Sequence, residues 1–154
     1  MIMRILPMNR YLHFAVDSRK VKKGSLFFAL NGKKIDGHCF LKQAKAAGAE
    51  AAVVSTNYKG PNFGLELIYQ QSVMEYLCQM SKEKIVNSGA KIVAITGSVG
   101  KTTTKEFLVQ LLKKEAIVAT RGNENTSTSI PLTILNEKAK PIYVLEMGMS
   151  EPNR

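Results

Sequence analysis

The chain has 154 residues, of which 45% are hydrophobic and 22% charged, and these proportions are typical of a soluble globular protein that buries a core. Its 22 lysines and arginines exceed its 12 acidic residues, and the net charge of +10 favours an anionic partner such as nucleic acid, a membrane surface or a phosphorylated small molecule. No stretch has the composition of a signal peptide or a membrane span, so we expect a cytoplasmic protein.

The first half of the chain predicts a small α/β unit. Residues 26–30 form an apolar run typical of a strand, and the pair Asn31-Gly32 after it is a strong turn signal. Apolar residues then recur at helical spacing over residues 40–47, and residues 51–54 predict a second buried strand. Strand, helix and strand in succession favour an α/β arrangement.

Further along, residues 65–68 are strand-like, and Ser72 with Glu75 forms a capping box before an apolar helix face. We interpret the methionines of that helix, and Tyr76, as core residues. Residues 87–89 read as a linker, so we place a domain boundary there and predict two domains, residues 1–87 and 88–154.

The two cysteines, Cys39 and Cys78, fall in apparently helical segments and lack the spacing of metal ligands. We expect buried thiols of a reducing compartment rather than a disulfide.

The second half opens with the most informative stretch of the chain, the nine residues 96–104. The β-branched run at residues 91–95 predicts a buried strand before it, and apolar residues at helical spacing predict a helix from about Thr102. A glycine turn between a strand and a helix start directs free N–H groups at an anion. Lys101 adds a positive charge there, and the Thr102 hydroxyl could bind Mg²⁺.

The strict phosphate-loop pattern has a glycine where this chain has Ile95. The alternative is a tight strand-to-helix turn with an exposed lysine. The strand before the turn and the helix after it favour phosphate binding.

After this helix, we expect a strand at residues 117–119, a polar loop at residues 121–129 and a third strand at residues 141–145. Glu146 directly follows that strand. An acidic residue at the carboxyl end of a strand, downstream of a phosphate loop, is where a nucleotide-binding fold holds its metal. The alternative is a simple surface glutamate.

These motifs resemble those of the Mur ligases, ATP-dependent enzymes that build the peptide stem of bacterial peptidoglycan. The loop at residues 96–103 is similar to the family's T-G-[ST]-x-G-K-T-T, and residues 17–38 are similar to the amino-terminal domain of its tripeptide-using members. The run Gly122-Asn123-Glu124-Asn125, with Pro131-Leu132-Thr133, is most similar to the members that add D-alanyl-D-alanine. The implied fold is a small α/β UDP-muramoyl-peptide-binding domain, then the first part of a parallel-sheet ATP-binding central domain that is truncated here.

The resemblance implies amide ligation with ATP and Mg²⁺ as cofactors: ATP phosphorylates the terminal carboxylate of a UDP-linked muramoyl tripeptide, and the amine of D-Ala-D-Ala displaces the phosphate. It implies catalytic roles for Lys101 and Glu146, and a metal held by Thr102 and Glu146. The implied cofactor-binding residues are Thr96, Gly97, Ser98, Val99, Gly100, Lys101, Thr102 and Thr103. The implied substrate-binding residues are Ser18, Arg19, Asp36, Gly37, His38, Asn123, Asn125 and Thr126.

Alternatives stay open at this point. His38 could equally be a turn histidine that caps the following helix. The chain could be the related ligase that adds the third amino acid, a small phosphate-loop kinase or NTPase, or a basic nucleic-acid-binding module. Under the resemblance we expect a monomer at full length without nucleic-acid or membrane partners, and we expect this chain alone to be catalytically silent.

Overall fold

The structure is a computed structural model that describes residues 10–32, 35–122 and 124–148. The chain divides into two compact units, Met1–Met80 and Ser81–Arg154. Helix α2 (Val73–Ser88) contributes residues to both units. The boundary predicted at residue 87 lies in this same helix, and the functional division into two domains stays a prediction.

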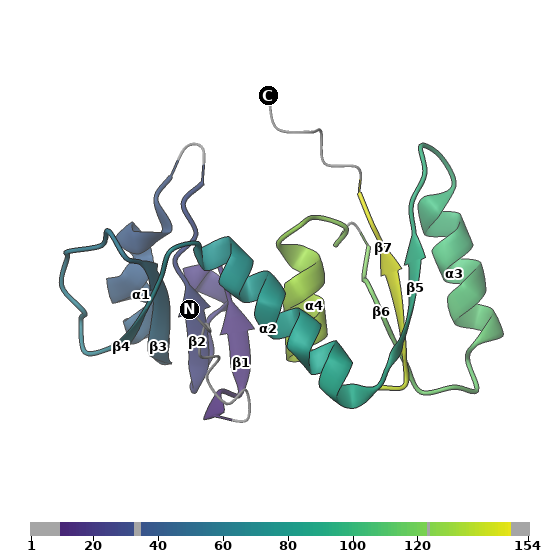
Figure 1. The fold of residues 1–154 in the computed structure, drawn as a ribbon, viewed down its shortest axis with the longest axis horizontal. Helices are drawn as coiled ribbons and strands as arrows, with labels where there is room; N and C mark the ends of the chain where they lie inside the picture. Colours follow the sequence, from purple (N-terminus) through teal and green to yellow (C-terminus); the bar gives the residue numbers. More distant parts are fainter. Residues whose placement is uncertain (1–9, 33–34, 123, 149–154) are drawn as a thin grey trace. The chain divides into compact units, whose positions relative to one another are not determined.

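Unit 1 is built on a four-stranded parallel sheet with the order β1-β2-β3-β4 (Figure 1). Its strands are β1 (His13–Ala15), β2 (Ser25–Phe28), β3 (Ala49–Ser55) and β4 (Glu66–Gln70). Between them lie two 3-10 helices, η2 (Ser18–Lys20) and η3 (Gly37–Phe40), and helix α1 (Leu41–Ala46). The order follows the sequence, so consecutive strands are neighbours, as is usual for short connections.

One hydrophobic cluster of unit 1 lies between α1 and the sheet. Leu41 and Ala44 of α1 pack with Phe27 and Ala52 of the sheet, and all four are fully buried. At the start of α2, the Glu75 N–H donates to Ser72 Oγ at 3.2 Å, which is one half of the predicted capping box. The prediction that Tyr76 and the methionines of α2 are core residues is confirmed for Tyr76 and Met80, which are fully buried.

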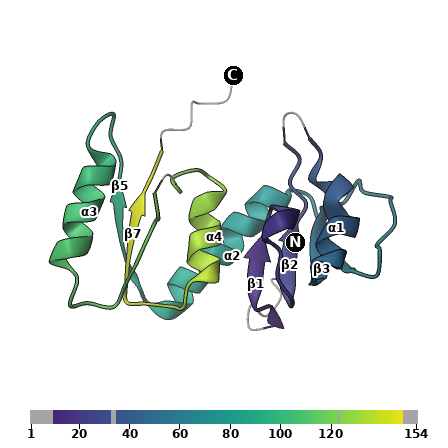
Figure 2. The ribbon, with the colours of Figure 1, turned by 180° about the vertical axis from the view of Figure 1, so that it is seen from behind.

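Unit 2 is built on a three-stranded parallel sheet with the order β5-β7-β6. Its elements are β5 (Lys91–Ile95), α3 (Lys101–Leu111), β6 (Ile117–Ala119), α4 (Ser129–Asn136) and β7 (Ile142–Glu146). Helix α3 lies on one side of the sheet and α4 on the other (Figures 1 and 2). Because β7 is central and Ile95 pairs with Glu146, the carboxyl end of β7 lies beside the start of the loop that leads into α3.

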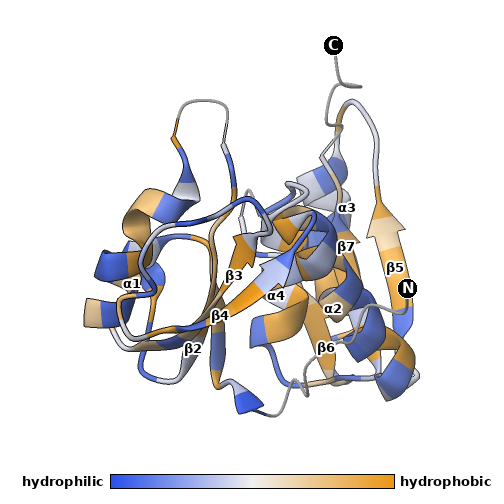
Figure 3. Cartoon of the chain, turned by 60° about the vertical axis from the view of Figure 1, so that its left-hand side comes forward, coloured by the Kyte–Doolittle hydropathy of each residue, from blue (hydrophilic) through white to orange (hydrophobic). Residues whose placement is uncertain are grey.

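Two predictions about burial are wrong. Strand β5 exists, but it is an edge strand that pairs only with β7 among the described strands, and Ile92 is 49% exposed. Figure 3 shows β5 as a largely hydrophobic strand. Cys39 and Cys78 are both exposed rather than buried, and neither forms a disulfide with a described residue. Among the described residues, no helix combines the length and the apolar character needed to span a membrane.

Candidate functional site

The loop between β5 and α3 depends on two glycines with positive φ, Gly97 at 148° and Gly100 at 80°. Gly100 is the N-cap of α3 in the left-handed region, which residues with a Cβ rarely adopt. No side chain caps this helix start, so the first N–H groups of α3 are open toward the loop. A glycine loop that leads into uncapped N–H groups is an anion-binding arrangement.

Lys101 lies over this loop. Its Nζ donates to the carbonyl oxygen of Gly97 at 2.6 Å, which holds the ammonium on the same side as the loop. Val99, at the tip of the loop, projects into solvent. The loop therefore presents a positive charge together with the uncapped amides of the helix start, and phosphate binding by the loop stays a prediction.

The centre of the site is the carboxylate of Glu146 at the end of β7. The Thr102 hydroxyl donates toward Oε1 and Oε2 at 3.1 and 3.0 Å, and Asn125 Nδ2 donates to Oε1 at 3.2 Å. Lys105 Nζ lies 3.4 Å from Oε2. The backbone N–H of Glu146 donates to Thr120 Oγ1 at 2.9 Å, which fixes the strand end.

Glu146 is only 2% exposed, so its interpretation as a simple surface glutamate is wrong. Burial raises the pKa of this carboxyl, but hydrogen bonds from Thr102, Asn125 and Lys105 and the charge of Lys105 lower it more. The net result is a pKa below the usual value, and the carboxylate is ionised at neutral pH.

Two members of this cluster, Lys105 and Thr120, were missed by the sequence reasoning. A lysine on a helix and a threonine after a short strand usually face solvent, so residue type alone gave no signal. Helical spacing from Lys101 could have indicated that Lys105 lies one turn further along the same face of α3.

The arrangement fits a magnesium ion. A hydroxyl and a carboxylate in contact offer the oxygen ligands that Mg²⁺ prefers, and Mg²⁺ commonly uses one or two protein carboxylates with phosphates and waters. Within the described ranges no group of three or more His, Cys, Asp or Glu side chains could hold a metal. A metal held by Thr102 and Glu146 stays a prediction.

The polar loop after β6 contributes Asn125 to the cluster. In addition to its contact with Glu146, the Asn125 carbonyl oxygen accepts the Gly148 N–H at 2.7 Å. Thr126 instead contacts the start of α4, where its Oγ1 accepts the Ser129 N–H at 3.1 Å. Asn123 lies outside the described residues. Substrate contacts of these loop residues stay predictions.

The predicted substrate residues of unit 1 follow the carboxyl ends of β1 and β2. Ser18 Oγ donates to Gln43 Oε1 at 2.8 Å, and Arg19 pairs with Asp17 at 2.7 Å. Gly37 has a packing role, because a Cβ there would lie 2.5 Å from the Leu30 carbonyl oxygen. The carboxyl ends of parallel strands are where ligands bind in open α/β sheets, which supports the predicted location.

His38 is fixed on both of its ring nitrogens. Nε2 accepts the backbone N–H of Ser55 at 3.0 Å, so the ring proton is on Nδ1, which lies 2.5 Å from Asp36 Oδ1. The ring stacks on Tyr58 with centroids 4.9 Å apart. Asp36, rather than His38, caps η3 through the His38 N–H. These contacts favour a structural role for His38, and its substrate role stays a prediction.

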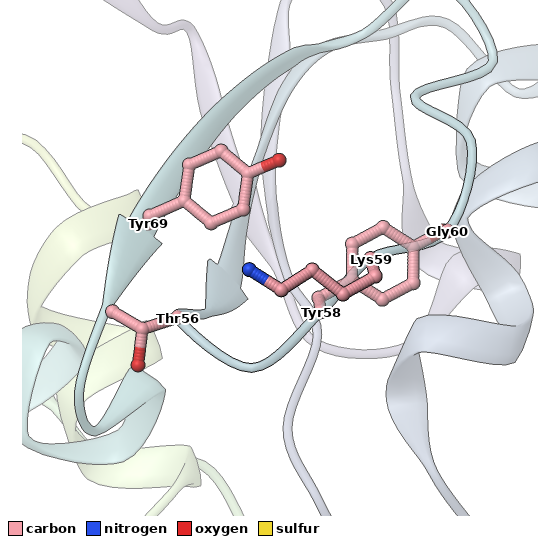
Figure 4. A pocket seen from close by; sticks show the side chains of 5 residues that line it. All are labelled: Thr56, Tyr58, Lys59, Gly60 and Tyr69. Carbon is pink, nitrogen blue, oxygen red and sulfur yellow. The ribbon is translucent and has the colours of Figure 1, made fainter.

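Beside this stack is a groove of about 470 Å³ that the sequence did not indicate. It is lined by Thr56, Tyr58, Lys59, Gly60 and Tyr69. Figure 4 shows the Lys59 side chain extending from the Tyr58 side of the groove toward Tyr69. Two aromatic rings and an ammonium suit a ligand that carries both a flat ring and a negative charge.

Comparison with known proteins agrees with this architecture. Residues 95–154 match the family model described as the Mur ligase middle domain. Proteins named UDP-N-acetylmuramoyl-tripeptide--D-alanyl-D-alanine ligase are similar over most of the chain. The protein from Bacillus subtilis is 36% identical, and the match covers 88% of this chain and 30% of that protein. The protein from Rickettsia prowazekii is 40% identical, and the match covers 87% of this chain and 30% of that protein. The chain thus spans about a third of the length of the curated relatives that it matches.

Solved structures give the same result. The crystal structure of the MurF ligase from Thermotoga maritima in complex with ADP has a TM-score of 0.82 and 37% identity, covering 96% of this chain and 34% of that one. A MurF crystal structure from Acinetobacter baumannii has a TM-score of 0.79 and 30% identity, covering 88% of this chain and 30% of that one. With their glycine loop and strand-end glutamate, residues 95–154 thus match the middle domain of the Mur ligases, and the chain is similar to MurF ligases over most of its length.

Proposed function

We propose that this chain provides the ATP-binding loop and the UDP-substrate unit of a ligase that adds D-alanyl-D-alanine to UDP-N-acetylmuramoyl-tripeptide. The observation that carries the proposal is the contact of the Thr102 hydroxyl with the Glu146 carboxylate, beside a glycine loop at the start of a helix. The names of the relatives and the ADP complex of the MurF ligase from Thermotoga maritima support it. Because the chain spans about a third of those proteins, the ligation itself is proposed for a longer protein.

The helix start, Lys101, Thr102 and the groups around Glu146 each have a role in this proposal. The N–H groups at the start of α3 would hold phosphate oxygens, and the Lys101 ammonium would add positive charge where charge develops on the transferred phosphoryl group. Thr102 and Glu146 would hold Mg²⁺, which supplies further positive charge to the phosphates. Asn125 would keep the Glu146 carboxylate turned toward Thr102 through its 3.2 Å hydrogen bond.

Nucleotide binding is tested by titrating ADP into the chain with Mg²⁺ and, separately, with EDTA. We expect Lys101→Met to weaken ADP binding by about ten- to a hundredfold, because a hydrogen bond from a charged group to an anion contributes about 1.5–3 kcal/mol. Lys113→Met, which removes an exposed lysine beyond the end of the same helix, is the matched control and should bind ADP as the wild type does. Equal affinity in all three proteins would refute the assignment of the loop.

The partners follow as further parts of the proposal. They are small molecules, a UDP-N-acetylmuramoyl-peptide and D-Ala-D-Ala, and we propose a cytoplasmic protein, monomeric at full length, that binds neither nucleic acid nor membranes. Titrating a UDP-sugar against a short single-stranded oligonucleotide separates this from a basic nucleic-acid-binding module. Oligonucleotide binding that weakens steeply with added salt, without UDP-sugar binding, would contradict the proposal.

A further inference from the structure

Lys105 is a buried cation that the roles above leave unexplained. It lies one helical turn after Lys101, and its side chain is 1% exposed. Its Nζ lies 3.4 Å from Glu146 Oε2, 3.4 Å from the Gly122 carbonyl oxygen and 3.4 Å from Oε1 of the exposed Glu106. A lysine is almost never this buried unless its charge is paired, so Glu146 and Lys105 form a buried ion pair at the proposed cation site.

The position of the Glu146 carboxylate does not depend on Lys105. Thr102 and Asn125 hold its oxygens at 3.0–3.2 Å, and the backbone of Glu146 is fixed to Thr120 at 2.9 Å. All of these contacts are shorter than the 3.4 Å to Lys105 Nζ. What Lys105 adds to the site is therefore mainly its positive charge.

That charge acts against a cation. A divalent ion that binds between Thr102 and Glu146 approaches a carboxylate already paired with one ammonium, and Lys101 brings a second ammonium to the same loop. Like charges repel more strongly beside buried groups such as Glu146 and Lys105, around which water is largely excluded. A nucleotide carries several negative charges, which offset the two lysines.

We propose that Lys105 is a built-in counter-ion for Glu146, so that the site accepts a divalent cation only together with a nucleotide. This inference rests on the proposed function, because it takes Thr102 and Glu146 as the cation ligands. It adds a role for Lys105: the lysine weakens binding of a free cation, so that the cation binds only when the nucleotide phosphates are present.

The experiment measures Mn²⁺ binding to the whole 154-residue chain by electron paramagnetic resonance of the unbound ion, with and without ADP. Mn²⁺ has the charge of Mg²⁺ and prefers the same oxygen ligands. We expect the wild type to bind Mn²⁺ when ADP is present and to leave it free when ADP is absent. Lys105→Met should bind Mn²⁺ without ADP at least about tenfold more tightly than the wild type, because it loses the repelling charge.

Three further variants show where and how the effect arises. Lys113→Met should behave as the wild type, since its lysine is exposed beyond α3. Combining Lys105→Met with Glu146→Gln should abolish the gained Mn²⁺ binding, because the carboxylate is lost. Lys105→Gln keeps a hydrogen-bond donor but removes the charge, so it should gain Mn²⁺ binding as Lys105→Met does. It is the variant to use if Lys105→Met does not fold.

The outcomes separate this inference from the proposed function. It is overturned if the wild type binds free Mn²⁺ as tightly as Lys105→Met, or if Lys105→Gln behaves as the wild type. A wild-type chain that binds no ADP even with Mn²⁺ overturns the nucleotide assignment itself. ADP-dependent Mn²⁺ binding in the wild type, with ADP-independent binding in both Lys105 variants, supports both.

Discussion

Glu146 receives contacts from three parts of the sequence: the start of α3, the end of β6 and the loop that follows β6. Thr102 and Asn125 supply donors to a carboxylate that burial alone would make costly to ionise, and Thr120 instead accepts the backbone N–H of Glu146. The cluster therefore lowers the pKa of Glu146 despite its burial. A single acidic residue thus becomes a preorganised ligand, because its neighbours fix both its charge and its orientation.

Asp17 gives a prediction about pH. Its carboxylate accepts hydrogen bonds from the side chain and backbone of Arg19, which lower its pKa from 3.8 to about 2. A depressed pKa stabilises the folded state above pH 3.8, and that contribution is lost as pH falls toward 2. We expect Asp17→Asn to be less stable than the wild type at pH 7, and most of this difference to have disappeared at pH 2.

Urea unfolding of both proteins at several pH values between 2 and 7 is the measurement. Asn at position 17 still accepts the Arg19 N–H, so the cap of η2 is kept and only the charge is removed. A stability difference that stays constant over the whole pH range would show that Asp17 does not contribute through its charge.

His38 joins two elements of unit 1, since its Nε2 accepts the N–H of Ser55 at the end of β3 while its own N–H is held by Asp36. We expect His38→Ala to lower the free energy of unfolding by about 1–3 kcal/mol, because the Ser55 N–H loses its partner. Its exposed neighbour provides the control: Cys39→Ala should change stability by less than about 0.5 kcal/mol. Equal effects of the two substitutions would argue against the structural role of His38.

Helix α3 has an apolar face that the described elements leave uncovered, with Leu111 79% exposed. We expect Leu111→Gln to change the free energy of unfolding by less than about 0.5 kcal/mol. In contrast, Leu145→Ala removes a buried side chain from the core of unit 2 and should cost about 2–5 kcal/mol. Guanidinium unfolding measures both, and a large loss in Leu111→Gln would mean that this face is packed in solution.

The elements themselves could largely be predicted from the sequence, because apolar runs and helical spacing mark β2, β3, α1, α2 and α3. Strand β1 was missed, since three residues are too few to show alternation. The burial of β5 was predicted wrongly because an apolar run does not tell an edge strand from a central one. In the site, the loop and Glu146 could be predicted because they belong to sequence motifs. Lys105 and Thr120 belong to no motif, and only the folded arrangement of α3, β6 and β7 brings them to Glu146.

At the scale of the whole chain, each unit has a hydrophobic cluster made of its own residues. The proposed nucleotide site lies entirely in unit 2. We expect ADP with Mg²⁺ to slow the hydrogen exchange of amides in β5, β7 and α3. The free energy of the opening that permits exchange should rise by up to about 2.7 kcal/mol at a ligand concentration a hundred times Kd. Amides of β3 in unit 1 should exchange at the same rate with and without ligand. Uniform protection of both units would contradict a site confined to unit 2.

The outer side of β5 has consequences for handling the protein. Its N–H and C=O groups find no partner strand among the described residues, and only Lys91 interrupts its apolar sequence. Such a row is a template on which another chain can extend the sheet, and natural edge strands oppose this with inward charges or bulges. Concentrated samples should therefore aggregate through this edge, and Val93→Lys should reduce the aggregation. Light scattering across a dilution series of both proteins measures this.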